Sequence, residues 1–176
     1  MKQKLRHLFY IIVLVGIDQL IKYWVRLNLM NQEPLVIIPK ILKLQYHENT
    51  GAVWGLFGGQ VQYLSILTLL ILLVIVFIYF KIPNTKKLNA LKIIFVFIAA
   101  GAIGNLIDRV FLKHVVDFIY FEIINFPLFN FADTCITISS ALLLILALFY
   151  YKDDDFLFLD QIFKGKKKDK KDSGQQ

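Results

Sequence analysis

Long apolar runs alternate with short polar stretches along the sequence. The apolar runs cover about 8–29, 61–80, 91–110 and 128–151. A helix needs about 20 apolar residues to cross the hydrocarbon core of a bilayer, whereas core strands are much shorter. The pattern therefore predicts an all-α integral membrane protein with four transmembrane helices, forming one domain over residues 1–163.

The loops between these runs differ in character. In the loop over 30–60, the stretches 35–38 and 41–46 are partly alternating and meet at Pro39 and Lys40. This favours two short strands joined by a turn, so we expect a small extracytoplasmic β-sheet between the first two helices. The loop over 111–127 joins the third and fourth helices, and Pro127 marks where the fourth helix can begin.

Basic residues predict the orientation of the helices. They cluster before the first run (Lys2, Lys4, Arg6), between the second and third (Lys81, Lys86, Lys87, Lys92), and after the fourth (Lys152, Lys164, Lys166, Lys167, Lys168, Lys170, Lys171). By the positive-inside rule, both termini are cytoplasmic and the loops over 30–60 and 111–127 lie outside the plasma membrane. Residues 164–176 form a Lys-rich cytoplasmic tail that we expect to be disordered.

Composition agrees with the membrane class. Hydrophobic residues make up 57% of the 176 residues, and mean hydropathy is +0.61, both above the usual values for a soluble domain. The net charge of +7 lies mainly in the cytoplasmic segments, which favours contact with membrane lipid and gives no indication of nucleic-acid binding. The single cysteine, Cys135, excludes a disulfide within the chain, and the spacing of His7, His47 and His114 predicts no metal site.

Polar residues interrupt the apolar runs. They are Asp18, Asn105, Asp108, Asn130 and Asp133, and Asp117 lies between two apolar pairs in the loop before the fourth run. An ionised Asp at the centre of a spanning helix costs about 2.5 to 3.5 kcal/mol, so each of these residues needs a partner, water or a function. Several of them together indicate a polar site that faces the interior of the bundle.

Helical spacing arranges these residues in three stripes, because positions three, four and seven apart share a face. The stripes are Asp18, Lys22 and Arg26 on the first helix; Gly101, Asn105, Asp108 and Arg109 on the third; and Asn130, Asp133, Thr134 and Thr137 on the fourth. For the first stripe, a structural interpretation is an ion pair between Asp18 and Lys22, with Arg26 extending outward. All three stripes converge toward the outer leaflet, which favours a site over scattered polar packing.

Two carboxylates are the groups best suited to catalysis. The sequence has no Gly-x-Ser-x-Gly motif, no Cys and His together and no metal cluster. Two nearby carboxyl groups can hydrolyse a peptide bond by sharing one proton. Asp117 and Asp133 form the best pair. Asp117, between apolar neighbours, is expected to be the acid, and Asp133, in the first turns of a helix, to be the base.

Five motifs in this order resemble the lipoprotein signal peptidases, or signal peptidase II, a family of bacterial intramembrane aspartyl proteases. They are Asp18-Gln19-Leu20-Ile21-Lys22, Asn49-Thr50-Gly51-Ala52-Val53-Trp54-Gly55, Gly101-Ala102-Ile103-Gly104-Asn105-Leu106-Ile107-Asp108-Arg109, Val115-Val116-Asp117-Phe118-Ile119 and Phe129-Asn130-Phe131-Ala132-Asp133. The resemblance spans nearly the whole chain. Each motif is weak alone, but the set and its order are specific.

The resemblance implies an aspartic endopeptidase without a cofactor, in the bacterial cytoplasmic membrane. Its substrate would be a prolipoprotein whose cysteine carries diacylglycerol, cleaved just before that cysteine. Asp117 and Asp133 would be catalytic. Residues that would bind substrate or support the site are Asp18, Lys22, Asn49, Gly101, Asn105, Asp108, Arg109 and Asn130.

Two alternatives from other classes stay open at this point. In a small proton- or ion-coupled carrier, Asp18, Asp108 and Asp133 would bind ions across the midplane, but the acids gather near one surface and the halves show no repeat. A noncatalytic scaffold leaves the two acids unexplained. We expect a monomer.

Overall fold

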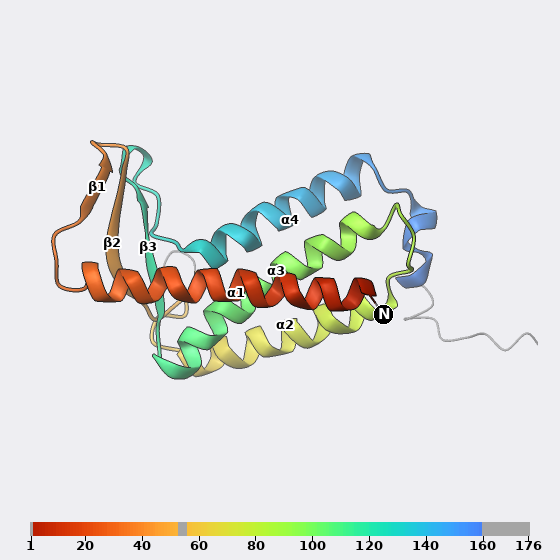
Figure 1. The fold of residues 1–176 in the computed structure, drawn as a ribbon, viewed down its shortest axis with the longest axis horizontal. Coiled ribbons are helices and arrows are strands. Elements are labelled where there is room, and N and C mark those ends of the chain that lie inside the picture. The colour runs from red at the N-terminus through yellow and green to blue at the C-terminus, as the bar shows by residue number, and fades with distance from the viewer. Residues whose placement is uncertain (1, 53–55, 160–176) are drawn as a thin grey trace, which may run out of the picture.

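Four long helices run side by side, and a small sheet stands at one end of them (Figure 1). The computed structural model describes residues 2–52 and 56–159. The helices are α1 (Lys2–Leu29), α2 (Val61–Lys81), α3 (Asn89–Phe111) and α4 (Phe131–Phe149). Each is long and apolar enough to cross a membrane, so the prediction of four membrane-spanning helices is confirmed.

Helix α3 is the centre of the bundle. Over half of its most apolar stretch is buried, and α1, α2 and α4 all pack on it, whereas α2 exposes most of its surface. Small residues at Ala99–Ala102 allow this close packing, since interhelical contacts in a membrane rely on backbones that approach closely. The apolar surfaces of α1, α2 and α4 that face outward are what lipid would cover.

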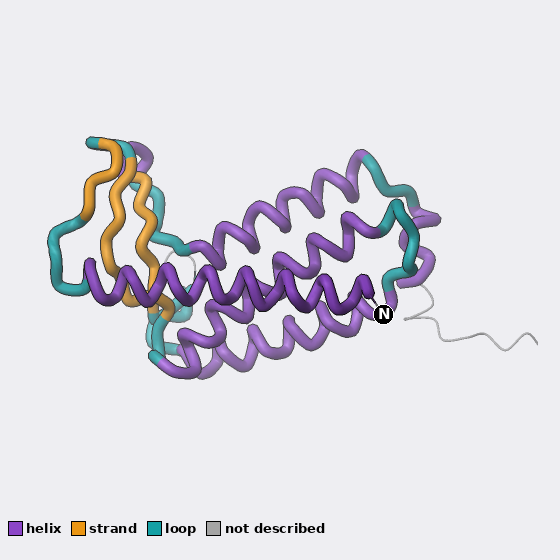
Figure 2. Tube along the Cα trace, viewed as in Figure 1, coloured by secondary structure: helices purple, strands orange, loops and turns teal. Residues whose placement is uncertain are grey.

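The sheet has three antiparallel strands in the order β1 (Leu35–Ile38), β2 (Leu42–Asn49) and β3 (Val115–Phe121), as Figure 2 shows. The predicted hairpin is confirmed, with Lys40 in its turn at a positive φ of 61°. No strand was predicted in the connection over 111–127, yet this segment contains β3. The sequence of β3 does not alternate, since its first four residues are all buried against α1 and the site.

Helix α4 begins three residues later than the apolar run suggested. Phe129 is held in a bridge with Ile119 of β3, where Phe129 N donates to Ile119 O at 3.1 Å and Phe129 O accepts from Ile119 N at 2.9 Å. Extended backbone at Phe129 prevents the helix from starting there. The bridge also fixes the first turn of α4 beside β3.

The opposite end of the bundle is closed by the segment after α4. A short 3-10 helix, η3 (Asp153–Phe156), leads to Phe158, which packs with Tyr151, Ile82, Leu88 and Leu91. Helix α1 starts at Lys2, six residues before its apolar run, because a helix can continue past the hydrocarbon core into the basic segment. The Lys-rich tail predicted over 164–176 and residues 53–55 of the second motif lie outside the described residues.

Candidate active site

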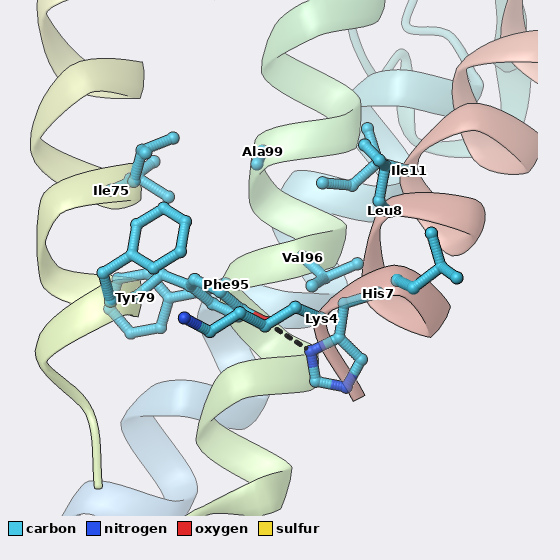
Figure 3. Close-up of a pocket in the computed structure, with 12 residues that line it drawn as sticks. Lys4, His7, Leu8, Ile11, Ile75, Tyr79, Phe95, Val96 and Ala99 are labelled. Carbon is cyan, nitrogen blue, oxygen red and sulfur yellow. Dashed lines mark hydrogen bonds between the residues drawn. The ribbon is translucent and has the colours of Figure 1, made fainter. Parts of the chain in front are cut away.

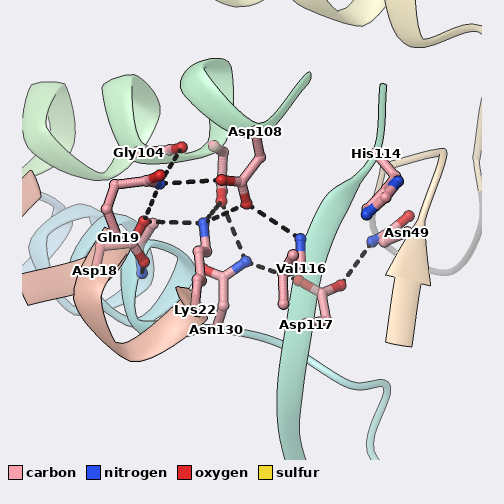
Figure 4. A network of polar contacts seen from close by, with 12 residues as sticks. Asp18, Gln19, Lys22, Asn49, Gly104, Asp108, His114, Val116, Asp117 and Asn130 are labelled. Carbon is pink, nitrogen blue, oxygen red and sulfur yellow. Dashed lines mark hydrogen bonds and ion pairs between the residues drawn. The ribbon is translucent and has the colours of Figure 1, made fainter. Parts of the chain in front are cut away.

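Asp117 lies in the middle of β3, almost completely buried at 1% exposure. In the sheet it is opposite His47 of β2. Asn49 is nearby on β2, and its Nδ2 donates to Asp117 Oδ2 at 2.8 Å (Figure 4). The sheet therefore carries one predicted catalytic acid and holds one of its carboxylate oxygens.

Asn130 holds the other oxygen of Asp117. Its Nδ2 donates to Asp117 Oδ1 at 2.7 Å, while its Oδ1 accepts from the backbone N of Asp133 at 2.9 Å. The Asp133 carboxylate in turn accepts from the backbone N of Asn130 at 3.2 Å, which completes a capping box. Asn130 is thus the N-cap of α4 and lies outside the helix, where it contacts both predicted acids.

Asn105 of α3 completes the connection between the acids. Its Nδ2 donates to Asp133 Oδ1 at 2.7 Å, and its Oδ1 accepts from Asn130 Nδ2 at 3.1 Å. The two carboxyl groups are therefore linked through two asparagine amides. Because both carboxyls accept hydrogen bonds from fixed donors, their orientations are set before any substrate arrives.

The pKa of Asp117 is raised from 3.8 to about 7. Burial is the main cause, since it removes water from the charged form, and repulsion by the Asp133 carboxylate adds to it. Hydrogen bonds from Asn49 and Asn130 and the charge of Lys22 lower the pKa by less. Asp117 can therefore carry a proton near neutral pH.

Three buried charged residues, one basic and two acidic, form ion pairs beside these two acids. Lys22 Nζ lies 2.9 Å from Asp18 Oδ2 and 2.9 Å from Asp108 Oδ2, and all three side chains are at most 2% exposed. The predicted ion pair of Asp18 with Lys22 is confirmed, and Asp108 joins it. Lys22 Nζ also donates to Asn105 Oδ1 at 3.0 Å, which connects this cluster to the two acids.

The same cluster joins four elements. Asp18 Oδ1 accepts from the backbone N of Ala132 at the start of α4, at 3.0 Å. Asp108 Oδ2 accepts from the backbone N of Val116 in β3, at 3.1 Å. The cluster of α1 and α3 charges therefore positions the backbone next to each predicted catalytic residue.

Gln19 also belongs to this network, although helical spacing did not predict it. Its Nε2 lies within hydrogen-bond distance of Asp18 Oδ2 (3.2 Å), Gly104 O (3.2 Å) and Asp108 Oδ1 (3.0 Å), as seen in Figure 4. It follows Asp18 directly and so lies outside the i, i+4 pattern on which the stripe rested. The only sequence signal for Gln19 was its place in the first motif.

Glycines allow the helices to approach at this level. A Cβ on Gly101 would lie 2.5 Å from the backbone O of Ala132, and one on Gly104 would lie 2.5 Å from Asp18 Oδ2. Both distances are shorter than any real contact. Gly101 thus supports the site through helix packing, outside the polar network.

Arg109 and Thr137 depart from their stripes. Arg109 Nη2 donates to the carbonyl O of Gly51 at 3.4 Å, and Asn49 Oδ1 accepts from the backbone N of Gly51 at 2.9 Å. Arg109 and Asn49 therefore hold the segment after β2. Thr137 is exposed, so the polar stripe of α4 ends at Thr134, whose hydroxyl donates to Asn130 O at 3.0 Å.

The chain is similar to known proteins of one family. The family model "Signal peptidase (SPase) II" matches residues 10–149. A lipoprotein signal peptidase of Latilactobacillus sakei is 40% identical over 127 residues, which are 72% of this chain and 82% of that protein. One of Clostridium acetobutylicum is 38% identical over 150 residues, or 82% of this chain and 94% of that protein.

Two solved structures are also similar to this chain. A bacterial membrane enzyme determined by the in meso method at 2.3 Å resolution superposes with a TM-score of 0.72 at 32% identity, covering 94% of each chain. A second, at 1.9 Å resolution, gives a TM-score of 0.70 at 34% identity over 84% of this chain and 94% of that one. This multi-pass membrane protein belongs to the signal peptidase II family.

Proposed function

We propose that this chain is an aspartic endopeptidase that removes the signal peptide from diacylglyceryl-modified prolipoproteins, with Asp117 and Asp133 as its catalytic pair. Membership of the signal peptidase II family supports the reaction and the prolipoprotein substrate. The observation that carries the catalytic assignment is the amide connection from Asp117 through Asn130 and Asn105 to Asp133. It holds two carboxyl groups in one small volume of the membrane enzyme.

The two acids take different roles. Asp133 accepts hydrogen bonds from Asn105 Nδ2 and from the backbone N of Asn130, the N-cap of α4, and these contacts orient its carboxylate to act as the base. Asp117, whose pKa is about 7, holds the shared proton. The ionised member takes a proton from water and the protonated member assists the carbonyl, as catalysis by two coupled carboxyls requires.

The reaction follows from this division. The oxygen of a water molecule attacks the carbonyl carbon before the lipidated cysteine and gives one proton to Asp133, while Asp117 gives its proton to the carbonyl oxygen. The tetrahedral intermediate then collapses. The carbon–nitrogen bond breaks, Asp133 gives its proton to the leaving amine and Asp117 recovers its own. The products are the signal peptide and a lipoprotein with a free amino group on its cysteine.

The remaining site residues orient these two groups or frame the substrate. Asn105 and Asn130 aim the carboxyls, and Lys22 with Asp18 and Asp108 holds α1, α3 and α4 in position. Asn49 and Arg109 fix the segment at Gly51, next to which the substrate backbone would lie. Gly101 provides the close helix contact below them.

The bilayer supplies part of the substrate's position. Basic residues at the end of the bundle opposite the sheet support a cytoplasmic location for both termini. The sheet then lies on the outer surface, and the acids lie at the outer leaflet, where a diacylglyceryl anchor holds the scissile bond. In this proposal residues 1–163 form one protease domain that acts as a monomer, and 164–176 form a cytoplasmic tail.

A carrier is the weaker candidate. It would use Asp18 and Asp108 to bind protons or ions, but both are already paired with Lys22 and with backbone amides. These charges serve to hold the helices together. Among the described membrane-spanning residues, no acid that an ion could use lies away from the sheet end of the bundle.

The test is cleavage, by purified protein, of a peptide that contains a lipobox, the sequence around the cysteine that carries diacylglycerol. Asp117→Asn and Asp133→Asn, made separately, should each abolish cleavage and leave the protein folded. Asp154→Asn, which removes an exposed carboxyl at the other end of the bundle, is the matched control and should cleave normally. Near wild-type turnover by either site variant refutes the assignment of the pair, whereas no cleavage by the unmutated protein refutes the peptidase.

A further inference from the structure

An apolar groove lies between α1 and α2 at the end of the bundle opposite the sheet. Its volume is about 460 Å³, and Figure 3 shows it with α2 on one wall, α1 on the other and Val96 and Ala99 of α3 on its floor. The groove exists because α1 and α2 both pack on α3 but have little contact with each other. In a bilayer it would open directly to the lipid chains.

Polar groups are confined to one end of this groove. Lys4 and His7 lie there with Tyr79, whose hydroxyl is 2.8 Å from His7 Nδ1. The His7 ring is 2% exposed, and its other nitrogen, Nε2, is buried without a hydrogen-bond partner. A buried polar atom without a partner is costly, so the protein leaves His7 incompletely satisfied at this end of the groove.

The charged side chains beside this end of the groove are those of two lysines, Lys4 and Lys92. Lys4 Nζ lies 4.7 Å from the centre of the Phe80 ring, and Lys92 Nζ lies 5.8 Å from that of Tyr79. Lys92 is buried, and its ammonium donates to the Asn84 side chain. Among the described residues, neither lysine has a carboxylate within ion-pair distance.

We propose that this groove binds one acyl chain of an anionic phospholipid, with the lipid phosphate beside Lys4 and the His7–Tyr79 pair. A basic, apolar pocket between membrane helices complements this class of ligand in both charge and polarity. His7 is eleven residues from Asp18, so the groove lies about 16 Å along α1 from the site residues. The inference is therefore independent of the proposed proteolysis.

The occupant is tested by native mass spectrometry of the full chain with added lipids. The protein should retain phosphatidylglycerol more strongly than phosphatidylcholine with the same acyl chains. Lys4→Gln should reduce that preference about fivefold, as expected for one lysine near a lipid phosphate. Lys40→Gln, which removes a charge from the exposed hairpin turn at the other end, should leave the preference unchanged.

A second pair of variants tests the acyl chain. Val76→Trp places an indole at the wall of the groove and should weaken retention of both lipids. Val74→Trp is the control, because it changes another exposed valine of α2 that lies outside the groove. Equal retention of the two lipids by the unmutated protein overturns the proposal, and so does equal retention by the two tryptophan variants. A dimer that Val76→Trp dissociates would make a second copy the occupant and would also overturn it.

Discussion

Asn130 donates from its side-chain nitrogen to Asp117 Oδ1 at 2.7 Å while the same side chain caps the helix that carries Asp133. One residue therefore serves two purposes, because its amide has both a donor and an acceptor. The acceptor starts α4, and the donor orients a buried carboxyl. Substitutions that keep one function and remove the other can separate helix stability from catalysis.

Replacing Asn130 with Ser should keep the helix cap but lose most of the activity. Ser caps a helix as well as Asn does, yet it has no amide donor for Asp117 or for Asn105. Asn130→Ser leaves buried oxygens of Asp117 and Asn105 without this donor, so its free energy of unfolding should fall by about 1 to 3 kcal/mol. Its turnover should fall roughly a hundredfold through misplacement of the acid. Asn130→Ala also removes the helix cap, so its free energy of unfolding should be about 1 kcal/mol lower than that of Asn130→Ser. Full activity of Asn130→Ser would show that the amide does not position Asp117.

Adding a methyl group at Gly104 should weaken the bundle. Its Cβ would lie 2.5 Å from Asp18 Oδ2, and Asp18 cannot move freely because it is bound to Lys22 and to the backbone of Ala132. Gly104→Ala should cost about 1 to 3 kcal/mol of unfolding free energy, as overpacking usually does. The measurement is thermal or denaturant unfolding in detergent.

Gly16→Ala is the matched control for this effect. Nothing lies within 4 Å of a Cβ at Gly16, and a helical Gly→Ala exchange without a clash is stabilising. The two variants should therefore shift stability in opposite directions. If Gly104→Ala were as stable as Gly16→Ala, α3 would pack less tightly against Asp18 at Gly104 than the structure shows.

Hydropathy predicted the helices well because a bilayer requires long apolar runs. Only the first two strands of the sheet could be predicted from the sequence. The hairpin of β1 and β2 is local and has a turn signal, whereas β3 pairs with residues about 70 positions earlier in the chain. Nothing in Val115–Phe121 alternates, since both faces of its first half are buried. Long-range pairing of that kind leaves no periodic pattern in the sequence.

The candidate site was predicted in its membership more than in its arrangement. Helical spacing indicated Lys22 as a partner of Asp18, and that pair is present. The link between acids through two amides depends on rotamers and on the bridge between Phe129 and Ile119, which spacing cannot predict. Gln19 was missed because its contacts come from a helix face adjacent to that of Asp18.

Removing Lys22 should be among the most damaging single changes to stability. Its ammonium lies between two buried carboxylates, and Lys22→Met would leave both without a counter-charge. Breaking a buried ion pair on one side costs about 3 to 5 kcal/mol. Unfolding in detergent measures the loss. Adding Asp18→Asn to Lys22→Met should recover part of it, because one uncompensated charge is then removed.

Arg26→Met tests whether the effect is specific to the buried charge. Arg26 is one helical turn further along α1 but exposed, so its removal should change stability by no more than about 0.5 kcal/mol. Similar losses at both positions would indicate a general effect of charge on α1. The buried cluster would then not be what holds these helices together.

Catalysis should decline as pH rises above neutral. Asp117 must carry the shared proton, and its pKa is about 7. The kcat/KM for the lipobox peptide should therefore fall about tenfold for each pH unit above that value, once the proton is lost. Measurements in one buffer system across pH 6 to 9 would give the profile. A rate that stays constant to pH 9 would mean that Asp117 does not act as the acid.

The same proton should make the stability of the protein depend on pH. The folded pKa of Asp117, about 7, is higher than its ordinary value of 3.8, so the folded protein retains a proton that the unfolded chain has lost. The stabilising contribution of Asp117 is complete below pH 3.8, decreases as pH rises toward 7 and does not decrease further above it.

Asp117→Asn carries no titrating proton and lacks this decline. The stability of the variant relative to the unmutated protein should therefore rise between pH 4 and pH 7, by a few kcal/mol at about 1.4 kcal/mol per pH unit, and then level off. Denaturant unfolding in mixed micelles measures it, with the neutral exchange Thr137→Ser as a control whose difference should not vary with pH. A difference for Asp117→Asn that falls with pH would mean that the folded state favours the charged form of Asp117, and the assignment of the shared proton to this residue would be wrong.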